Sequence, residues 1–154
     1  MGSNPTLGTT NSLHHHMLNA TETRRLYAME VCIEEVEPVI RNINSFMSFA
    51  KYVWRHEAPK NWPCPEIKLG QGTFYCGRYL SYCVGRSFIE IARPDAKISV
   101  LLHELTHALQ NGSPSHGRKF CDRYFDLLVK YAHFDRFELE TLADFYKVVY
   151  TSKT

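Results

Sequence analysis

The sequence predicts an α+β fold, in which a helix or a helix pair precedes a small, mostly antiparallel sheet and further helices follow it. Apolar side chains recur at helical spacing over residues 20–56 and again after residue 96, whereas residues 57–95 are rich in aromatic and β-branched side chains. The chain has 154 residues, of which 44% are hydrophobic, which is enough for one core. We therefore expect one compact domain over residues 19–154.

The first eighteen residues stand apart in composition. Residues 1–18 are rich in Gly, Ser, Thr and Asn and include His14-His15-His16. We interpret them as a disordered tail or a cloning remnant and leave them out of the fold. Consecutive His side chains can bind metal weakly, but a flexible tract does not hold them in the geometry of a catalytic site.

The segment 20–56 is predicted to be helical. Its apolar face consists of Ile33, Val36, Ile40, Ile43, Met47 and Ala50. Pro38 interrupts the pattern, so either one kinked helix or two helices form here.

Three strands are predicted over residues 73–76, 80–84 and 87–92, after a Pro-rich extended connector around Trp62. Gly85-Arg86 has the composition of a two-residue hairpin turn between the last two strands, with Gly first as a type II′ turn requires. The strands together predict a small sheet that precedes the next helix directly.

The helix expected after Asp95, which can serve as its N-cap, carries the most informative motif of the chain. His103-Glu104-Leu105-Thr106-His107 follows the pattern H-E-x-x-H in a stretch without Pro or Gly. Positions i and i+4 share one helix face, so the imidazoles of His103 and His107 can reach one metal ion. Glu104 lies beside them, where its carboxylate can accept a proton from water.

A third His completes the expected site. His116 follows a turn at Asn111-Gly112, which fits a left-handed helix end, and stands near the first turn of the next predicted helix. Three protein ligands leave a fourth position open, which is the pattern of a catalytic zinc site. Two alternatives stay open. An acid such as Glu138 or Asp144 could be the third ligand, or the His and Glu side chains could share the helix by coincidence, although buried polar groups without partners are costly.

These residues resemble the SprT-like metallopeptidases, whose pattern is H-E-x-x-H, a variable gap, and then H-G-x-x-F or H-G-x-x-W. The matching residues are His103 to Leu109 and Ser115 to Phe120, and the resemblance covers roughly residues 98–128. Eight residues separate the second and third His, which is more than in the metzincin pattern. No Cys-x-x-Cys follows His116, so the C-terminal zinc ribbon of longer members is missing.

The resemblance implies a zincin-like fold and hydrolysis of peptide bonds in a protein or peptide substrate. It implies zinc ligands at His103, His107 and His116, Glu104 as the general base, and Phe120 packed beneath the third ligand. In zincins an edge strand pairs with the extended substrate, and residues 87–92 are the candidate here. An internal strand is the open alternative. The candidate oxyanion donors by type are Tyr75, Tyr79, Tyr82, Tyr124 and Tyr131.

The charge and the cysteine content of the chain indicate which kinds of partner and which cellular compartment to expect. The net charge of +2, from 18 basic and 16 acidic residues, gives no support for DNA or a membrane surface as a partner. The stretch from Lys51 to Lys97 is more basic, and we interpret it as solvated surface. No apolar run spans a bilayer, and no signal-peptide core is present, so we expect a cytoplasmic protein. Cys76 and Cys83 could pair in a hairpin, but free thiols are the simpler interpretation of five Cys residues.

Three functional hypotheses follow from these observations. The leading one is a zinc endopeptidase. The second is a metal-binding module that acts at DNA or a protein partner without proteolysis, against which the intact Glu104 argues, since a binding role needs no base. The third is a structural α/β protein in which the spacing of the His residues is coincidental.

Overall fold

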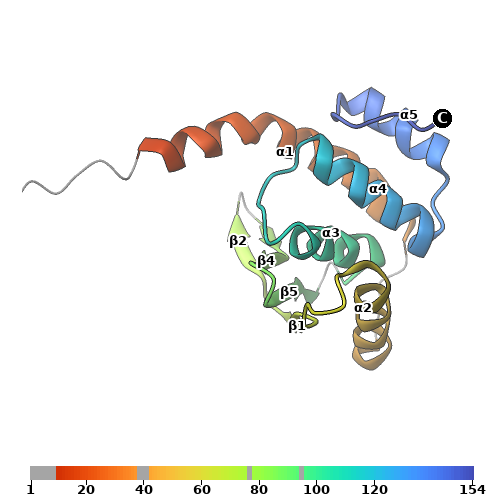
Figure 1. Ribbon diagram of the computed structural model, residues 1–154. Coiled ribbons are helices and arrows are strands. Elements are labelled where there is room, and N and C mark those ends of the chain that lie inside the picture. Colours follow the sequence, from red (N-terminus) through yellow and green to blue (C-terminus); the bar gives the residue numbers. More distant parts are fainter. Residues whose placement is uncertain (1–9, 38–41, 76–77, 94–95) are drawn as a thin grey trace, which may run out of the picture.

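The computed structural model of the chain describes residues 10–37, 42–75, 78–93 and 96–154 (Figure 1). The elements along this part of the chain are α1 (Thr10–Val36), α2 (Ile43–Glu57), β1 (Glu66–Gly70), β2 (Thr73–Tyr75), β3 (Arg78–Leu80), β4 (Tyr82–Val84), β5 (Phe88–Ala92), α3 (Ile98–Leu109), α4 (Arg118–Ala132) and α5 (Arg136–Tyr146). Of these elements, two helices precede the strands in the chain and three follow them, which confirms the predicted α+β class.

The first helix is longer than the sequence indicates. Composition assigns residues 10–18 to a tail, whereas α1 begins at Thr10; residues 1–9 lie outside the described residues. No Gly or Pro occurs between Gly8 and Pro38, so nothing in the chain stops a helix before Val36. Two helices rather than one form on either side of Pro38, which itself lies outside the described residues.

The sheet has three strands in the order β1-β5-β4, with β5 in the centre. β1 runs parallel to β5 and β4 runs antiparallel to it, while β2 and β3 form a separate antiparallel pair. Ile67 of β1 lies opposite Ile89 of β5, and both side chains are buried. β1 was not among the strands predicted from the sequence, because it directly follows the Pro-rich connector around Trp62.

The central place of β5 corrects one expectation. Residues 87–92 were the candidate edge strand for substrate pairing, but β5 is paired on both sides, which is the alternative that the sequence left open. The hairpin before it also differs in length. Ser87 N–H donates to Val84 O (3.2 Å) around Gly85-Arg86 as predicted, yet strand pairing resumes only at Phe88, so the loop has three residues instead of two.

α3 lies between the sheet and α4, and most of its surface is buried (Figure 1). Its N-cap position is Lys97, which makes no side-chain capping bond, and the expected cap Asp95 lies outside the described residues. The carboxylate of Glu37, just beyond the end of α1, accepts the Ser99 N–H instead, at 3.2 and 3.3 Å. The start of α3 is therefore held by α1, a contact across 62 positions of the chain.

The structure bears on two further expectations, that the cysteines are free thiols and that no segment spans a membrane. Cys32, Cys64, Cys83 and Cys121 are free thiols, and Cys76 lies outside the described residues, as does any pairing with it. Among the described helices, none combines the length and the apolar character that crossing a membrane requires.

Glu57, the last residue of α2, ties this helix to α4. Its carboxylate binds Arg123 Nη2 at 2.8 Å and Lys130 Nζ at 2.5 Å, and it accepts a hydrogen bond from the Tyr131 hydroxyl at 2.6 Å. Burial alone would raise the pKa of Glu57, but these hydrogen bonds and the Arg123 charge hold the pKa below its ordinary value of 4.5. A lowered pKa means that folding favours the ionised carboxylate.

We expect Glu57→Gln to lower the free energy of unfolding at pH 7 by about 1 kcal/mol, because the partners Arg123 and Lys130 are partly exposed to solvent. The stabilisation is present above the unfolded-state pKa and is lost as the pH falls through the lower folded-state pKa. Urea unfolding of wild type and variant at pH 7 and in steps below pH 4.5 should therefore show the difference shrinking. Glu66→Gln, at an exposed position of β1, is the control; an equal loss there, or a gap independent of pH, would contradict the assignment.

Candidate metal centre

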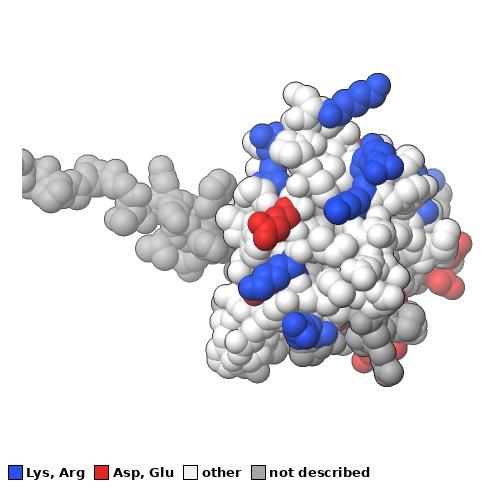
Figure 2. All heavy atoms as spheres, turned by 90° about the horizontal axis from the view of Figure 1, so that it is seen from below, with Lys and Arg blue, Asp and Glu red and all other residues white. Residues whose placement is uncertain are grey.

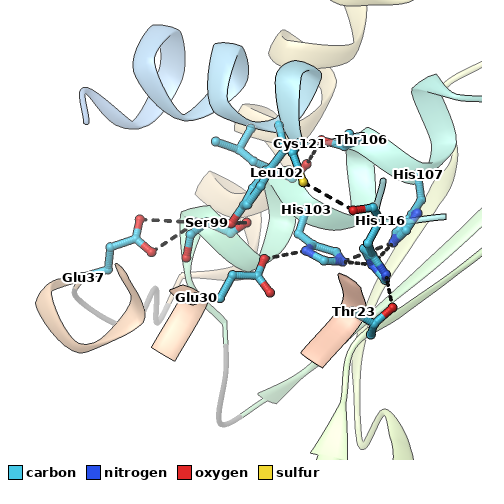
Figure 3. A network of polar contacts seen from close by, with 11 residues as sticks. Thr23, Glu30, Glu37, Ser99, Leu102, His103, Thr106, His107, His116 and Cys121 are labelled. Carbon is cyan, nitrogen blue, oxygen red and sulfur yellow. Dashed lines mark hydrogen bonds and ion pairs between the residues drawn. The ribbon is translucent and has the colours of Figure 1, made fainter. Parts of the chain in front are cut away.

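α3 presents the first two candidate ligands from adjacent turns. His103 and His107 are four residues apart, and their Nε2 atoms lie 3.1 Å from each other (Figure 3). Both side chains are buried, with 5% and 8% of the residue surface exposed. The i, i+4 spacing therefore does what the motif predicts: it brings two imidazole nitrogens to one point inside the domain.

The chain turns back after α3 to bring in the third ring. Asn111 and Gly112 both have positive φ (59° and 73°), as the predicted left-handed helix end requires. A Cβ on Gly112 would meet the backbone of Gly85 at 2.3 Å, so only glycine fits where this turn passes the β4–β5 hairpin. His116 then follows just before α4, and its Nε2 lies 3.0 Å from that of His103 and 3.0 Å from that of His107.

The three Nε2 atoms form a nearly equilateral triangle that suits a metal ion. Two nitrogens bound to one tetrahedral zinc at 2.0–2.1 Å lie about 3.3 Å apart. The triangle needs to open only slightly to reach that separation. No other group of three His, Cys, Asp or Glu side chains converges this way in the part of the chain that the structure describes. His103, His107 and His116 could therefore hold a metal ion.

The other nitrogen of each ring is bound to an oxygen. His103 Nδ1 lies 2.5 Å from Glu30 Oε1, and His116 Nδ1 lies 3.0 Å from the Thr23 hydroxyl (Figure 3). His107 Nδ1 lies 2.7 Å from the Ser113 carbonyl oxygen. The Glu30 carboxylate and the Ser113 carbonyl can only accept, so they favour a proton on Nδ1 of His103 and His107, and the Thr23 hydroxyl can accept from His116 Nδ1 in the same way. In a neutral ring with this tautomer, the Nε2 lone pair faces the centre. Such outer partners fix the tautomer and the orientation of metal-binding imidazoles.

Two of these partners come from α1, far away in the sequence. Thr23, Tyr27 and Glu30 stand at i, i+4 and i+7 on one helix face, and this face covers His103 and His116. None of these three residues was predicted from the sequence to lie at the site. Polar residues on a predicted amphipathic helix ordinarily face solvent, and the only available signal was their shared helical spacing.

Phe120 forms the apolar floor of the cluster. Its ring centroid lies 4.9, 4.5 and 4.9 Å from those of His103, His107 and His116, and the side chain is 1% exposed. This contact agrees with the place that the sequence resemblance implied for Phe120. Cys121, next to it, donates its thiol hydrogen to the His116 carbonyl at 3.4 Å, which further holds the turn that bears the third ligand.

Burial and charge set the protonation of the rings. Burial lowers the pKa of His107 to about 3 and that of His116 to about 2, so both rings are neutral, as metal ligands must be. Burial also acts to lower the pKa of His103, but the charge and hydrogen bond of Glu30 outweigh it and raise the pKa to about 8. Glu30 therefore makes the first ring the most basic of the three.

Glu104 is buried beside the cluster and faces a hollow. Its residue surface is 6% exposed, and burial raises the pKa of its carboxyl to about 7. No residue in the described part of the chain forms a hydrogen bond with its carboxylate. The hollow that it lines lies between α1, the β3–β4 junction and α3, and its walls are Tyr27, Glu30, Glu34, Leu80, Ser81, Val100, His103 and Glu104. A buried carboxylate that lines a hollow next to three imidazoles can exchange protons with a molecule bound there.

The remaining candidates from the sequence lie away from the cluster. Glu138 and Asp144, the alternative acidic ligands, are exposed on α5. The side chains of His14 to His16 lie outside the described residues.

No family model matches the chain, and comparisons with curated proteins and with solved structures find no match either. The SprT-like resemblance therefore stays a prediction that rests on the motif residues alone.

We expect the protein to bind about one zinc ion per chain, measured by metal analysis after gel filtration. His116→Ala should weaken zinc binding by more than about 100-fold, beyond what the loss of an outer-shell partner costs. Glu138→Gln should leave it unchanged, since that side chain is exposed and remote. Replacing His14, His15 and His16 together by Ala is the control for the N-terminal histidines; loss of the zinc in that variant alone would overturn the assignment.

We expect Glu30→Gln to lower zinc affinity about 10- to 100-fold, because the carboxylate orients His103 through its Nδ1. Competition against a chelator of known affinity measures the change. Glu35→Gln, on the exposed face of the same helix, is the matched control and should bind zinc as wild type does. Equal affinities for wild type and Glu30→Gln would show that the Glu30 contact does not support the ligand.

Proposed function

We propose that the protein is a zinc-dependent metallopeptidase that hydrolyses peptide bonds with Glu104 as the general base. The observation that carries the proposal is the position of Glu104: a buried carboxylate, adjacent in sequence to a candidate ligand, that lines the hollow beside the cluster. A site that only stored or carried a metal would not need an additional acid–base group at this position.

The donor set supports zinc in particular. His103, His107 and His116 would hold the ion, since three imidazole ligands with one further position open are typical of catalytic zinc. When bound, zinc lowers the pKa of water to about 7 and polarises a carbonyl group. The three outer partners and the Phe120 floor keep the rings aligned, so that the site is organised before substrate arrives.

Glu104 would carry the proton through the reaction. Its carboxylate accepts a proton from the attacking water and later gives that proton to the leaving amine, which is the general acid–base cycle of amide hydrolysis. Because its carboxylate is buried and has no hydrogen-bond partner among the described residues, no competing contact has to break before it acts.

A peptide is the substrate that the surroundings favour. β4 packs against α3 and is paired only with β5 among the described strands, so its other edge can accept an extended backbone. The hollow with Glu104 begins directly before β4, at Leu80 and Ser81. We therefore propose β4, in place of β5, as the strand along which substrate lies.

The alternative is a metal-binding module that acts at DNA or at a protein partner without proteolysis. Lys and Arg appear as separate groups on the largely uncharged face shown in Figure 2, which does not make a continuous track for a phosphate backbone. We favour the peptidase, in the cytoplasm, where the free thiols described above would stay reduced.

We expect Glu104→Gln to lower peptide hydrolysis by about 10²- to 10⁴-fold, the cost of losing a positioned general base. Zinc content should stay near that of wild type, because Glu104 is not a ligand. A fluorogenic peptide library, assayed with and without a chelator, measures the first quantity, and metal analysis measures the second.

The control for Glu104→Gln is His103→Ala, which should lose zinc and activity together. Hydrolysis by Glu104→Gln at the wild-type rate would refute the mechanism. A loss of zinc equal to that of His103→Ala would make Glu104 a ligand instead.

A further inference from the structure

Attack on a peptide carbonyl moves negative charge onto its oxygen. Groups that stabilise this oxyanion need to be in place before the reaction, and each donor contributes substantially to the rate. The sequence offered five tyrosines as donors by residue type and could not choose among them. The structure instead draws attention to a tyrosine outside that set.

Tyr27 of α1 contacts both the candidate ligands and the hollow. Its ring centroid lies 5.9 Å from that of His103 and 5.5 Å from that of His116, and the residue is half-buried. It lines the same hollow as Glu104. Glu104 and the Tyr27 ring thus line one hollow, together with His103.

The position of Tyr27 is fixed from both sides along α1. Thr23, four residues before it, binds His116, and Glu30, three residues after it, binds His103. The helix turn that bears Tyr27 is thereby fastened to two rings of the cluster. A donor held in this way does not have to be ordered at the moment of reaction, which is the condition for effective oxyanion stabilisation.

The five tyrosines considered from the sequence do not share this position. The Tyr124 hydroxyl, although its ring touches His103, is buried and donates to the Ser99 carbonyl at 3.3 Å. Tyr131 donates to Glu57. Tyr79 is exposed and packs on Phe74, and Tyr82 packs on Phe88. The side chain of Tyr75 lies outside the described residues.

We propose that Tyr27 donates a hydrogen bond from its hydroxyl to the oxyanion of the tetrahedral intermediate, an inference that rests on the proposed peptidase function. As the water oxygen bonds to the carbonyl carbon, the π electron pair of the carbonyl moves to its oxygen, and the proton released goes to Glu104. Tyr27 keeps its own proton and only shares it. When the C–N bond breaks, the electron pair returns to form the carbonyl, and Glu104 protonates the amine.

The test uses a phosphinic peptide, whose tetrahedral phosphinate oxygens mimic the oxyanion, with the sequence of a peptide that the enzyme cleaves. Tyr27→Phe removes one hydroxyl and keeps the ring against His103 and His116. In zinc-loaded protein, calorimetry should show that Tyr27→Phe binds the phosphinic peptide about 100-fold more weakly than wild type, with kcat lowered to a similar extent. KM for the matching substrate and the affinity for zinc should stay unchanged, which a purely structural role of the hydroxyl would not produce.

Ser81→Ala tests the competing donor, since Ser81 brings another hydroxyl to the same hollow, and its Oγ accepts the Ala92 N–H at 2.9 Å. Tyr52→Phe, which removes an exposed tyrosine hydroxyl on α2 away from the hollow, is the matched control and should bind the phosphinic peptide as wild type does. If Ser81→Ala, and not Tyr27→Phe, loses affinity for the phosphinic peptide, the donor is Ser81 and the assignment to Tyr27 is overturned. Unchanged binding and kcat in Tyr27→Phe, with zinc lost only in Tyr27→Ala, would reduce Tyr27 to a packing residue.

Failure of the proposed function looks different. In that case zinc-loaded wild type and Glu104→Gln would be equally inactive on all peptides, and the inference about Tyr27 would fall with it.

Discussion

The fold depends on burying three imidazoles and two carboxylates, those of Glu30 and Glu104, around one point. Polar groups taken out of water are costly unless they find partners, and four of these five have one. Glu30 and His103 satisfy each other, and the Ser113 carbonyl and the Thr23 hydroxyl serve His107 and His116. Glu104 is the exception, with no hydrogen-bond partner in the described part of the chain. The apolar core is arranged around this network: Phe120 lies beneath the rings, and Tyr124 packs behind Phe120.

The three imidazoles come from one helix and from the connection that follows it. α3 is buried on nearly all sides and supplies two rings and the Glu104 carboxylate from one helix, whose backbone fixes their spacing. The third ring comes from a connection, and that connection is held by a left-handed turn against a hairpin, a thiol hydrogen bond and the start of α4. The hollow lies between α3, α1 and the β3–β4 junction, so its walls come from three separate parts of the chain.

The features of the site that depend on local geometry could be predicted from the sequence. The i, i+4 histidines, the positive φ at Asn111 and Gly112, and the β5 strand all follow from spacing or residue type within a few positions. Parts that depend on distant pairing could not be found that way. β1 is a strand because β5 lies beside it, and Glu37 is a helix cap because folding brings it to Ser99. Glu30 and His103 are 73 residues apart, and nothing near Glu30 distinguishes it from the other acids of α1.

The two hydrogen bonds from α1 to the imidazoles couple the docking of this helix to the binding of a metal ion at the cluster. Whatever binds the folded state alone stabilises it, and here the bound state includes the docked face of α1. An ion that aligns His103 and His116 would stabilise the hydrogen bonds that these rings form with Glu30 and Thr23. Without the ion, these two hydrogen bonds would be weaker. A metal ion bound at the cluster would therefore make local opening of α1 less favourable, and opening of α1 would weaken metal binding. If the cluster holds a metal ion, loss of that ion would raise the exposure of α1 to proteases without requiring the rest of the domain to unfold.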